Sequence, residues 1–160
     1  MKVELLRATI KDAKELYAMQ IKTFKELLDK YQDFDTSPGN ENIEKVEMRL
    51  KQHFTYYYFI CVDSQKVGAI RIVDKKEVGK KKRISPLFIL PEFQGQGIAQ
   101  KAICLCEQIH GKEEWQLETI LQEPKNCYLY EKMVYRQTGK TEVINERLTL
   151  VFYEKKGYQK

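Results

Sequence analysis

The chain has 160 residues, of which 42% are hydrophobic and 32% charged, and its 28 Lys and Arg outnumber its 23 Asp and Glu. This length and apolar content predict a single domain spanning residues 1–160, and they exclude a disordered or low-complexity chain. No window approaches the ~18 uninterrupted apolar residues of a membrane helix, and the N-terminus lacks the apolar run of a signal peptide, so we expect a cytoplasmic protein without a membrane partner.

The spacing of apolar residues predicts the first helices. From Ala13 to Tyr31 apolar side chains recur every three or four positions, as on one face of a long helix. Thr9 and Asp12 form a capping pair before it. A loop containing Pro and Gly follows from Asp33 to Asn40, and the pattern then predicts a shorter helix at residues 43–50.

Runs of β-branched and aromatic residues predict the strands. In chain order, we expect strands at 3–8, 56–62, 66–73, 82–90, 115–121, 141–144 and 147–153, and two more helices at 98–110 and 124–133. Gly139 precedes the last two strands. Pro86 interrupts the strand at 82–90 and indicates an edge, a bulge or a local opening, because proline cannot donate to a ladder. The order βααβββαβαββ predicts an α/β or α+β sheet covered by helices.

The spacing of the cysteines and of the basic residues argues against several classes of function. The four cysteines include no C-x-x-C pair, so we expect neither a zinc site nor a disulfide framework. The basic run from Lys80 to Arg83 has no interleaved aromatic residues, which is typical of a solvated hairpin rather than a nucleic-acid site.

A glycine-containing loop joins the strand at 82–90 to the helix at 98–110. It reads Gln94-Gly95-Gln96-Gly97-Ile98-Ala99. Glycines let a backbone approach a ligand, and the first N–H groups of a helix have no internal partner, so this junction is a candidate anion site. A dinucleotide fingerprint requires a third glycine where Gln100 stands, and the Gly-Lys-Ser/Thr of a Walker loop is absent.

The loop resembles the pyrophosphate loop of the Gcn5-related N-acetyltransferase (GNAT) superfamily, Gln/Arg-x-x-Gly-x-Gly/Ala, at every fixed position. A second family block, a strand followed by a Pro-opened helix ending in Leu-Tyr-Glu-Lys-x-Gly-Phe, resembles Trp115 to Tyr135, where Leu129-Tyr130-Glu131-Lys132 is intact. Two positions depart from the pattern. Val134 stands where the family usually has Gly, and Glu123 stands where many members have a cofactor-contacting Asn, for which Asn126 is the expected substitute.

The resemblance implies a mixed, largely antiparallel central sheet whose central strands splay apart to admit the pantetheine arm of acetyl-CoA. Leu87 and Ile89 would offer backbone groups to the pantetheine. The amides of Gln96, Gly97, Ile98 and Ala99 would hold the pyrophosphate, with Gln94, Gly95 and Asn126 completing the cofactor contacts. Acetyl-CoA is then the co-substrate, and no metal is implied.

Acetyl transfer to an amine needs a base and an acid. The amine, with a pKa of about 10.4, must lose a proton, and the departing thiolate, with a pKa of about 8.5, must gain one. The resemblance gives the acid role to Tyr130. Glu118 lies twelve residues before Tyr130, the spacing at which ribosomal-protein N-terminal alanine acetyltransferases carry a glutamate base. The structural alternatives are a core tyrosine with its hydroxyl satisfied and a strand carboxylate that faces solvent or pairs with lysine.

Other candidate nucleophiles and bases suit this acetyl transfer less well than Tyr130 and Glu118. His53 is isolated, and His110 ends a helix, where a positive imidazole suits the helix dipole. Cys104 and Cys106 lie in a helix without a polar activator, so a covalent thiol intermediate is not expected.

The sequence therefore predicts an acetyl-CoA-dependent N-acetyltransferase in which a primary amine, on a small molecule or a peptide, attacks the thioester directly. The alternative is a non-catalytic acyl-CoA-binding or regulatory module, which the departures at Glu123 and Val134 leave open. No nucleic-acid partner is expected. A homodimer formed through the β-rich C-terminus remains open, and no motif identifies the acceptor amine.

Overall fold

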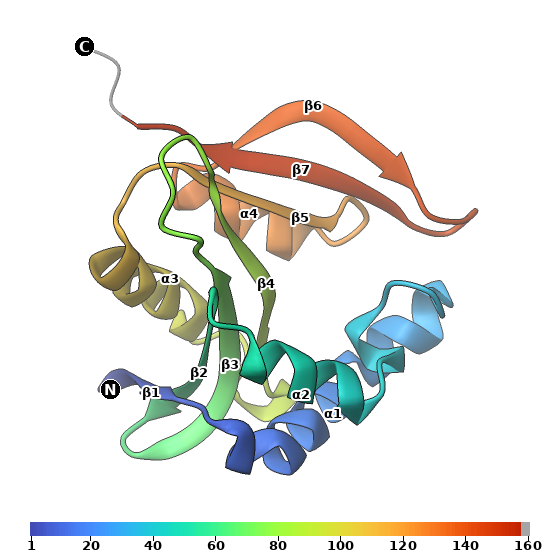
Figure 1. Cartoon of the computed structure of the whole chain (residues 1–160). Coiled ribbons are helices and arrows are strands. Elements are labelled where there is room, and N and C mark those ends of the chain that lie inside the picture. The colour runs from blue at the N-terminus through green and yellow to red at the C-terminus, as the bar shows by residue number, and fades with distance from the viewer. Residues whose placement is uncertain (158–160) are drawn as a thin grey trace.

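The computed structural model describes residues 1–157, through which a seven-stranded sheet runs (Figure 1). Its strand order is β1-β2-β3-β4-β5-β7-β6, and neighbouring strands are antiparallel except for β4 and β5, which are parallel. The elements are β1 (Val3–Arg7), α1 (Ala13–Tyr31), α2 (Ile43–Lys51), β2 (Thr55–Val62), β3 (Gln65–Val73), β4 (Lys82–Ile89), α3 (Ile98–His110), β5 (Trp115–Ile120), α4 (Pro124–Lys132), β6 (Arg136–Val143) and β7 (Thr149–Lys155). The predicted mixed, largely antiparallel sheet flanked by helices is confirmed.

The predicted order of elements is also confirmed, and all boundaries except the start of β6 agree within two residues. The capping pair is present, since the Thr9 N–H donates to Asp12 Oδ2 at 2.8 Å. It begins a 3₁₀ turn, Ile10–Asp12, directly before α1. None of the helices within residues 1–157 is long and apolar enough to cross a bilayer.

The start of β6 was predicted wrongly. The strand begins at Arg136, five residues before the expected position, and Gly139 lies within it, where the register against β7 shifts. All eight residues of β6 are exposed. Since this edge strand has no buried face, its first residues lack the apolar alternation that marks a strand in a sequence.

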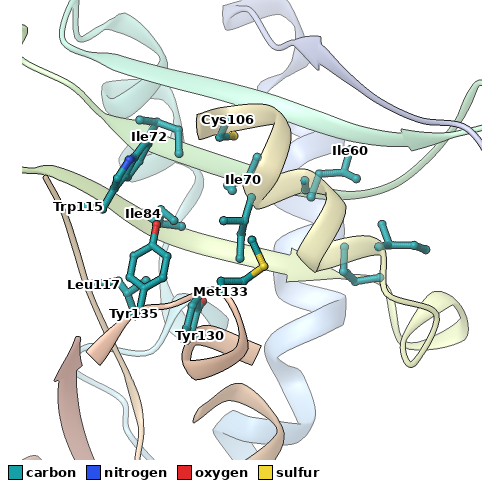
Figure 2. Close-up of a cluster of buried hydrophobic side chains, with 14 of the residues drawn as sticks. Ile60, Ile70, Ile72, Ile84, Cys106, Trp115, Leu117, Tyr130, Met133 and Tyr135 are labelled. Carbon is teal, nitrogen blue, oxygen red and sulfur yellow. The ribbon is translucent and has the colours of Figure 1, made fainter. Parts of the chain in front are cut away.

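Helices cover both faces of the sheet. Leu16 of α1 and Val46 of α2 pack against Tyr57 and Phe59 of β2 on one face. On the other face, side chains of α3 and α4 join a larger core with Ile60, Ile70, Trp115 and Leu117 (Figure 2). The alternation of inward and outward side chains along β2 explains why the aromatic run in this strand serves both cores.

The sheet opens between β4 and β5. These strands share only the pairs Lys82↔Trp115 and Arg83↔Gln116, after which they diverge (Figure 1). β4 meanwhile stays paired with β3 to Ile89, with an irregular register around Pro86. Both expectations are therefore confirmed: the central strands splay, and Pro86 marks an irregularity in the ladder.

Candidate functional site

The loop before α3 presents a row of free amides. Gln94 to Gly97 are exposed, and within residues 1–157 no backbone N–H of residues 95–100 donates to a protein acceptor. The first turn of α3 contains no acidic residue. Because the positive end of the helix dipole lies at these groups and no carboxylate opposes it, the arrangement suits an anion.

The backbone of this loop requires its glycines. Gly95 and Gly97 have φ angles of 80° and 77°, in the left-handed region that side chains disfavour. A Cβ atom at either position would meet nothing within 4 Å, so the space in front of the amides is open. The Gln94 side chain turns back, and its Nε2 donates to the Ile89 carbonyl at 2.8 Å. Gln94 thus fastens the loop to the end of β4.

The edge of β4 that faces the opening carries backbone groups of Leu87 and Ile89. The N–H of Leu90 donates to the Val67 carbonyl of the β3 side at 2.8 Å. Since successive residues of a strand direct their N–H and C=O groups to alternate sides, those of Leu87 and Ile89 point toward β5. With β5 diverging there, these are the groups along which an extended chain could lie.

Tyr130, in the last turn of α4, lies in the core beneath α3 (Figure 2). Its ring centroid is 6.0 Å from that of Tyr135 and 6.1 Å from that of Tyr153. Within the described residues its hydroxyl forms no hydrogen bond. Burial, and then the negative charge of Glu118, raise the pKa of Tyr130 above its ordinary value.

Glu118 lies on β5 and is paired with Arg83 of β4. Both carboxylate oxygens accept from the guanidinium, which donates through Nη2 and through Nε, the latter at 3.3 Å. The Glu118 side chain is 23% exposed and that of Arg83 is 40% exposed. This ion pair joins the two strands just beyond the point where their ladder ends. The partner is an arginine, where the sequence suggested a lysine as the alternative.

Glu123 is directed toward α1. Its Oε2 accepts a hydrogen bond from the Tyr31 hydroxyl and lies 3.0 Å from Lys30 Nζ. Burial alone would raise the pKa of Glu123, but the bonds from Tyr31 and Lys30 outweigh it and the pKa is lowered. Glu123 therefore connects the end of α1 with the start of α4, while Asn126 lies half-buried in the first turn of α4.

Val134, at the end of α4, stands where the resembled family pattern has glycine, and its backbone conformation explains that preference. Its φ angle is 72°, and the next N–H, of Tyr135, donates back to the Tyr130 carbonyl at 2.9 Å. This is a helix end with a left-handed residue, a conformation that costs about 1–2 kcal/mol for a non-glycine side chain.

We expect Val134→Gly to stabilise the protein. The valine is 61% exposed, so its loss removes little packing. Relief of the left-handed strain exceeds the added chain entropy, which gives a gain of about 0.5–1 kcal/mol in the free energy of unfolding. Thermal or urea unfolding measures it. Val143→Gly, at an exposed strand position with ordinary φ, is the control and should destabilise.

Sequence reasoning missed the partners of these residues. Arg83 belongs to a basic run typical of a solvated hairpin, and nothing in the run indicates a parallel register with β5. Likewise no local signal connects Tyr31 with Glu123, which lie 92 positions apart. Two of the predicted groups, the loop at the start of α3 and the edge of β4, adjoin the opening between β4 and β5. The other two residues influence each other, because the charge of Glu118 raises the pKa of Tyr130.

Comparison with protein families gives a match over residues 20–157 to a family described as acetyltransferase (GNAT) domain. Comparison with curated protein sequences gives no match.

Solved structures with the same fold include three acetyltransferases. The microcin C7 self-immunity acetyltransferase MccE, in complex with acetyl-CoA and AMP, has a TM-score of 0.72 at 18% identity, covering 95% of this chain and 91% of its own. Spermidine N-acetyltransferase from Vibrio cholerae, in complex with CoA and spermine, has a TM-score of 0.73 at 15% identity, covering 94% and 93%. The ribosomal L7/L12 α-N-protein acetyltransferase RimL, in complex with coenzyme A, has a TM-score of 0.72 at 15% identity, covering 96% and 93%. At these identities the likeness establishes the fold.

Proposed function

Because this chain belongs to the GNAT acetyltransferase family, we propose that it transfers the acetyl group of acetyl-CoA directly to a primary amine. One observation carries the proposal. The free amides at the start of α3 lie beside the opening between β4 and β5, so an anion site adjoins a gap bordered by backbone groups of β4 that no strand pairs.

In this proposal the pyrophosphate of acetyl-CoA binds the amides from Gln96 to Ala99, with Gly95 and Gly97 leaving room for it. The pantetheine arm lies along β4 and bonds to the backbone of Leu87 and Ile89. Gln94 contributes by holding the loop against β4, and Asn126 borders the cofactor from α4. The complexes of MccE with acetyl-CoA and of RimL with coenzyme A support this choice of co-substrate.

The chemical step needs one proton removed and one supplied. The amine nitrogen forms a bond to the thioester carbon, the C–S bond breaks, and backbone N–H groups of β4 stabilise the oxyanion between these events. We assign the base to Glu118, which receives the amine proton directly or through water, and the acid to Tyr130, which gives its proton to the departing sulfur. The free hydroxyl of Tyr130 and the effect of Glu118 on its pKa support this pairing.

Release of free thiol tests the proposal. The protein is mixed with acetyl-CoA and, in separate reactions, with spermidine, free amino acids and a peptide with a free N-terminus. Thiol appearing in proportion to enzyme, together with an acetylated amine in the mass spectrum, is the expected result. Saturable acetyl-CoA binding by calorimetry without turnover on any amine would instead identify the non-catalytic acyl-CoA-binding module.

That second function has one specific observation in its favour. Both carboxylate oxygens of Glu118 already accept hydrogen bonds from the Arg83 guanidinium, so neither is free of a partner within the protein. The proposed enzyme therefore requires that the amine or a water reach the exposed side of Glu118.

Replacing Glu118 with glutamine is expected to lower kcat/KM about 100-fold or more, because the proton acceptor is lost. Thermal stability should change by less than about 1 kcal/mol, since the ion pair with Arg83 is partly exposed. Glu142→Gln, on the exposed face of β6, is the matched control. A Glu118→Gln enzyme that works at the full rate would remove Glu118 from the mechanism.

Three further expectations belong to the same proposal. The continuous sheet supports one domain for the whole chain. The free thiols of Cys61, Cys104, Cys106 and Cys127 support a reducing compartment such as the cytoplasm. The exposed edge strand β6 supports a homodimer formed by strand pairing, to be tested by sedimentation.

A further inference from the structure

A cavity of about 540 Å³ lies at the far end of α3 from the glycine loop. Its lining includes Arg7 at the end of β1, Tyr56 and Tyr58 of β2, Lys76 and Lys82 around the β3–β4 turn, and His110 at the end of α3. Since α3 has 13 residues and a helix rises about 1.5 Å per residue, about 18 Å separate this cavity from the loop amides. The cavity is therefore distinct from the proposed pyrophosphate site.

Cations gather in this cavity without anionic partners. Within residues 1–157, none of Arg7, Lys76 and Lys82 forms an ion pair with a carboxylate. The Arg7 guanidinium and the Lys76 ammonium lie 4.6 Å and 5.3 Å from the ring centroid of Tyr56. Lys82 Nζ donates to the Glu113 carbonyl at 2.7 Å. Aromatic rings and a carbonyl position these groups but do not neutralise them.

The carboxylates of the lining are already engaged. Asp74 Oδ2 lies 2.8 Å from His110 Nδ1, and His110 Nε2 lies 2.9 Å from the Tyr58 hydroxyl. Glu77 pairs with Lys80 at 3.3 Å, in an exposed pair. With Asp74 as acceptor, the neutral imidazole carries its proton on Nδ1 and accepts from Tyr58 at Nε2.

His110 adds no charge to this wall. Burial lowers the pKa of His110 below its ordinary value, against the opposing effect of Asp74 and with the help of Lys76 and Lys82. Burial and the neighbouring lysines thus disfavour the positive imidazole that a helix end would otherwise favour. An anion in the cavity would face the cations Arg7, Lys76 and Lys82, whose three positive charges outnumber the one charge of Asp74 that the neutral imidazole leaves in place.

We propose that this cavity binds a small organic anion with at least two negative charges close together, as a phosphate monoester or a polycarboxylate carries. Three cations from two regions of the chain, the end of β1 and the β3–β4 turn, line this cavity, and a dianion with several oxygens can contact them together. The volume leaves space for an organic group beside the tyrosine rings.

The chain contains a built-in reporter for this cavity. Trp115 is the single tryptophan, its ring lies 5.1 Å from Lys82 Nζ, and its centroid is 6.4 Å from that of His110. The protein is titrated with glucose 6-phosphate, with citrate and with uncharged glucose while the fluorescence of Trp115 is followed. Saturation by glucose 6-phosphate or citrate, but not glucose, is expected. If glucose 6-phosphate saturates the signal at a lower concentration than citrate does, the recognised group is a phosphate; if citrate does so, it is a carboxylate.

Charge-removing variants locate the site. Arg7→Gln and Lys76→Gln should each weaken binding about tenfold, and Lys51→Gln, an exposed lysine on α2, should leave it unchanged. Lys76 is on an exposed turn, so its variant remains informative if Arg7→Gln fails to fold. Gly97→Leu should retain the signal, because the loop amides are the other anion site. Equal response to glucose, equal effect of Lys51→Gln, or loss of the signal in Gly97→Leu would overturn the proposal.

Discussion

Replacing Gly97 with leucine is expected to weaken acetyl-CoA binding at least about 100-fold while the protein remains folded. Gly97 precedes α3 with a φ of 77°, and a Cβ there meets nothing within 4 Å, so the substitution creates no clash. The added side chain instead enters the open space beside the free amides. Loss of two charge-assisted hydrogen bonds to a pyrophosphate, at about 1.5–3 kcal/mol each, accounts for the size of the effect. Isothermal calorimetry with acetyl-CoA measures it.

The matched control is Gly139→Leu. Gly139 lies in β6 with a φ of 93°, and a Cβ atom there would also meet nothing within 4 Å, so leucine suffers a similar backbone strain at this position, away from α3. Both variants should lose about 1–2 kcal/mol of stability, but Gly139→Leu should bind acetyl-CoA as the original protein does. Normal binding by Gly97→Leu would remove the loop from the cofactor site.

The helices and most strands were predictable because each has a strong local pattern. The three-and-four spacing from Ala13 to Tyr31 arises from one buried stripe, and Pro86 signals a ladder irregularity through its missing donor. The first residues of β6, from Arg136 to Lys140, lack such a signal because they are all exposed. Local pattern thus predicts an element where one side is buried, and fails where neither side is.

The candidate site likewise has a part that local sequence predicts and a part that it does not. The loop from Gln94 to Ala99 was predictable because its sequence alone requires left-handed glycines and a helix start. The pairing of Glu118 with Arg83 was not, because it depends on the register of two parallel strands connected through α3. The same holds for Tyr58, His110 and Asp74, which come from two strand regions and a helix end. Contacts between distant segments need the folded arrangement.

Replacing Tyr130 with phenylalanine is expected to lower kcat about 100-fold or more, within the range that general acid catalysis contributes, and to leave acetyl-CoA affinity unchanged. The ring keeps its packing beside Tyr135 and Tyr153, and the lost hydroxyl has no partner among the described residues, so stability should change by less than about 1 kcal/mol. Steady-state kinetics and calorimetry on the same preparation separate the two effects.

The pH profile provides a second test of Tyr130. Burial and the charge of Glu118 raise its pKa above the ordinary 10.0, so the phenol stays protonated, and able to donate, at every pH below about 10. Ionisation of Tyr130 should therefore produce no falling limb in the activity of the original protein over that range.

Tyr153→Phe distinguishes the loss of an acid from the loss of any buried hydroxyl. The Tyr153 hydroxyl donates to Glu131 Oε2 at 2.6 Å, so its removal leaves a carboxylate without its donor and should cost about 1–2 kcal/mol of stability. Its kcat should stay within about threefold of the original, since a hydroxyl already donating to a carboxylate has no proton directed at the sulfur. Equal kcat losses in the Tyr130 and Tyr153 variants would mean that disturbed packing, rather than a missing proton donor, lowers the rate.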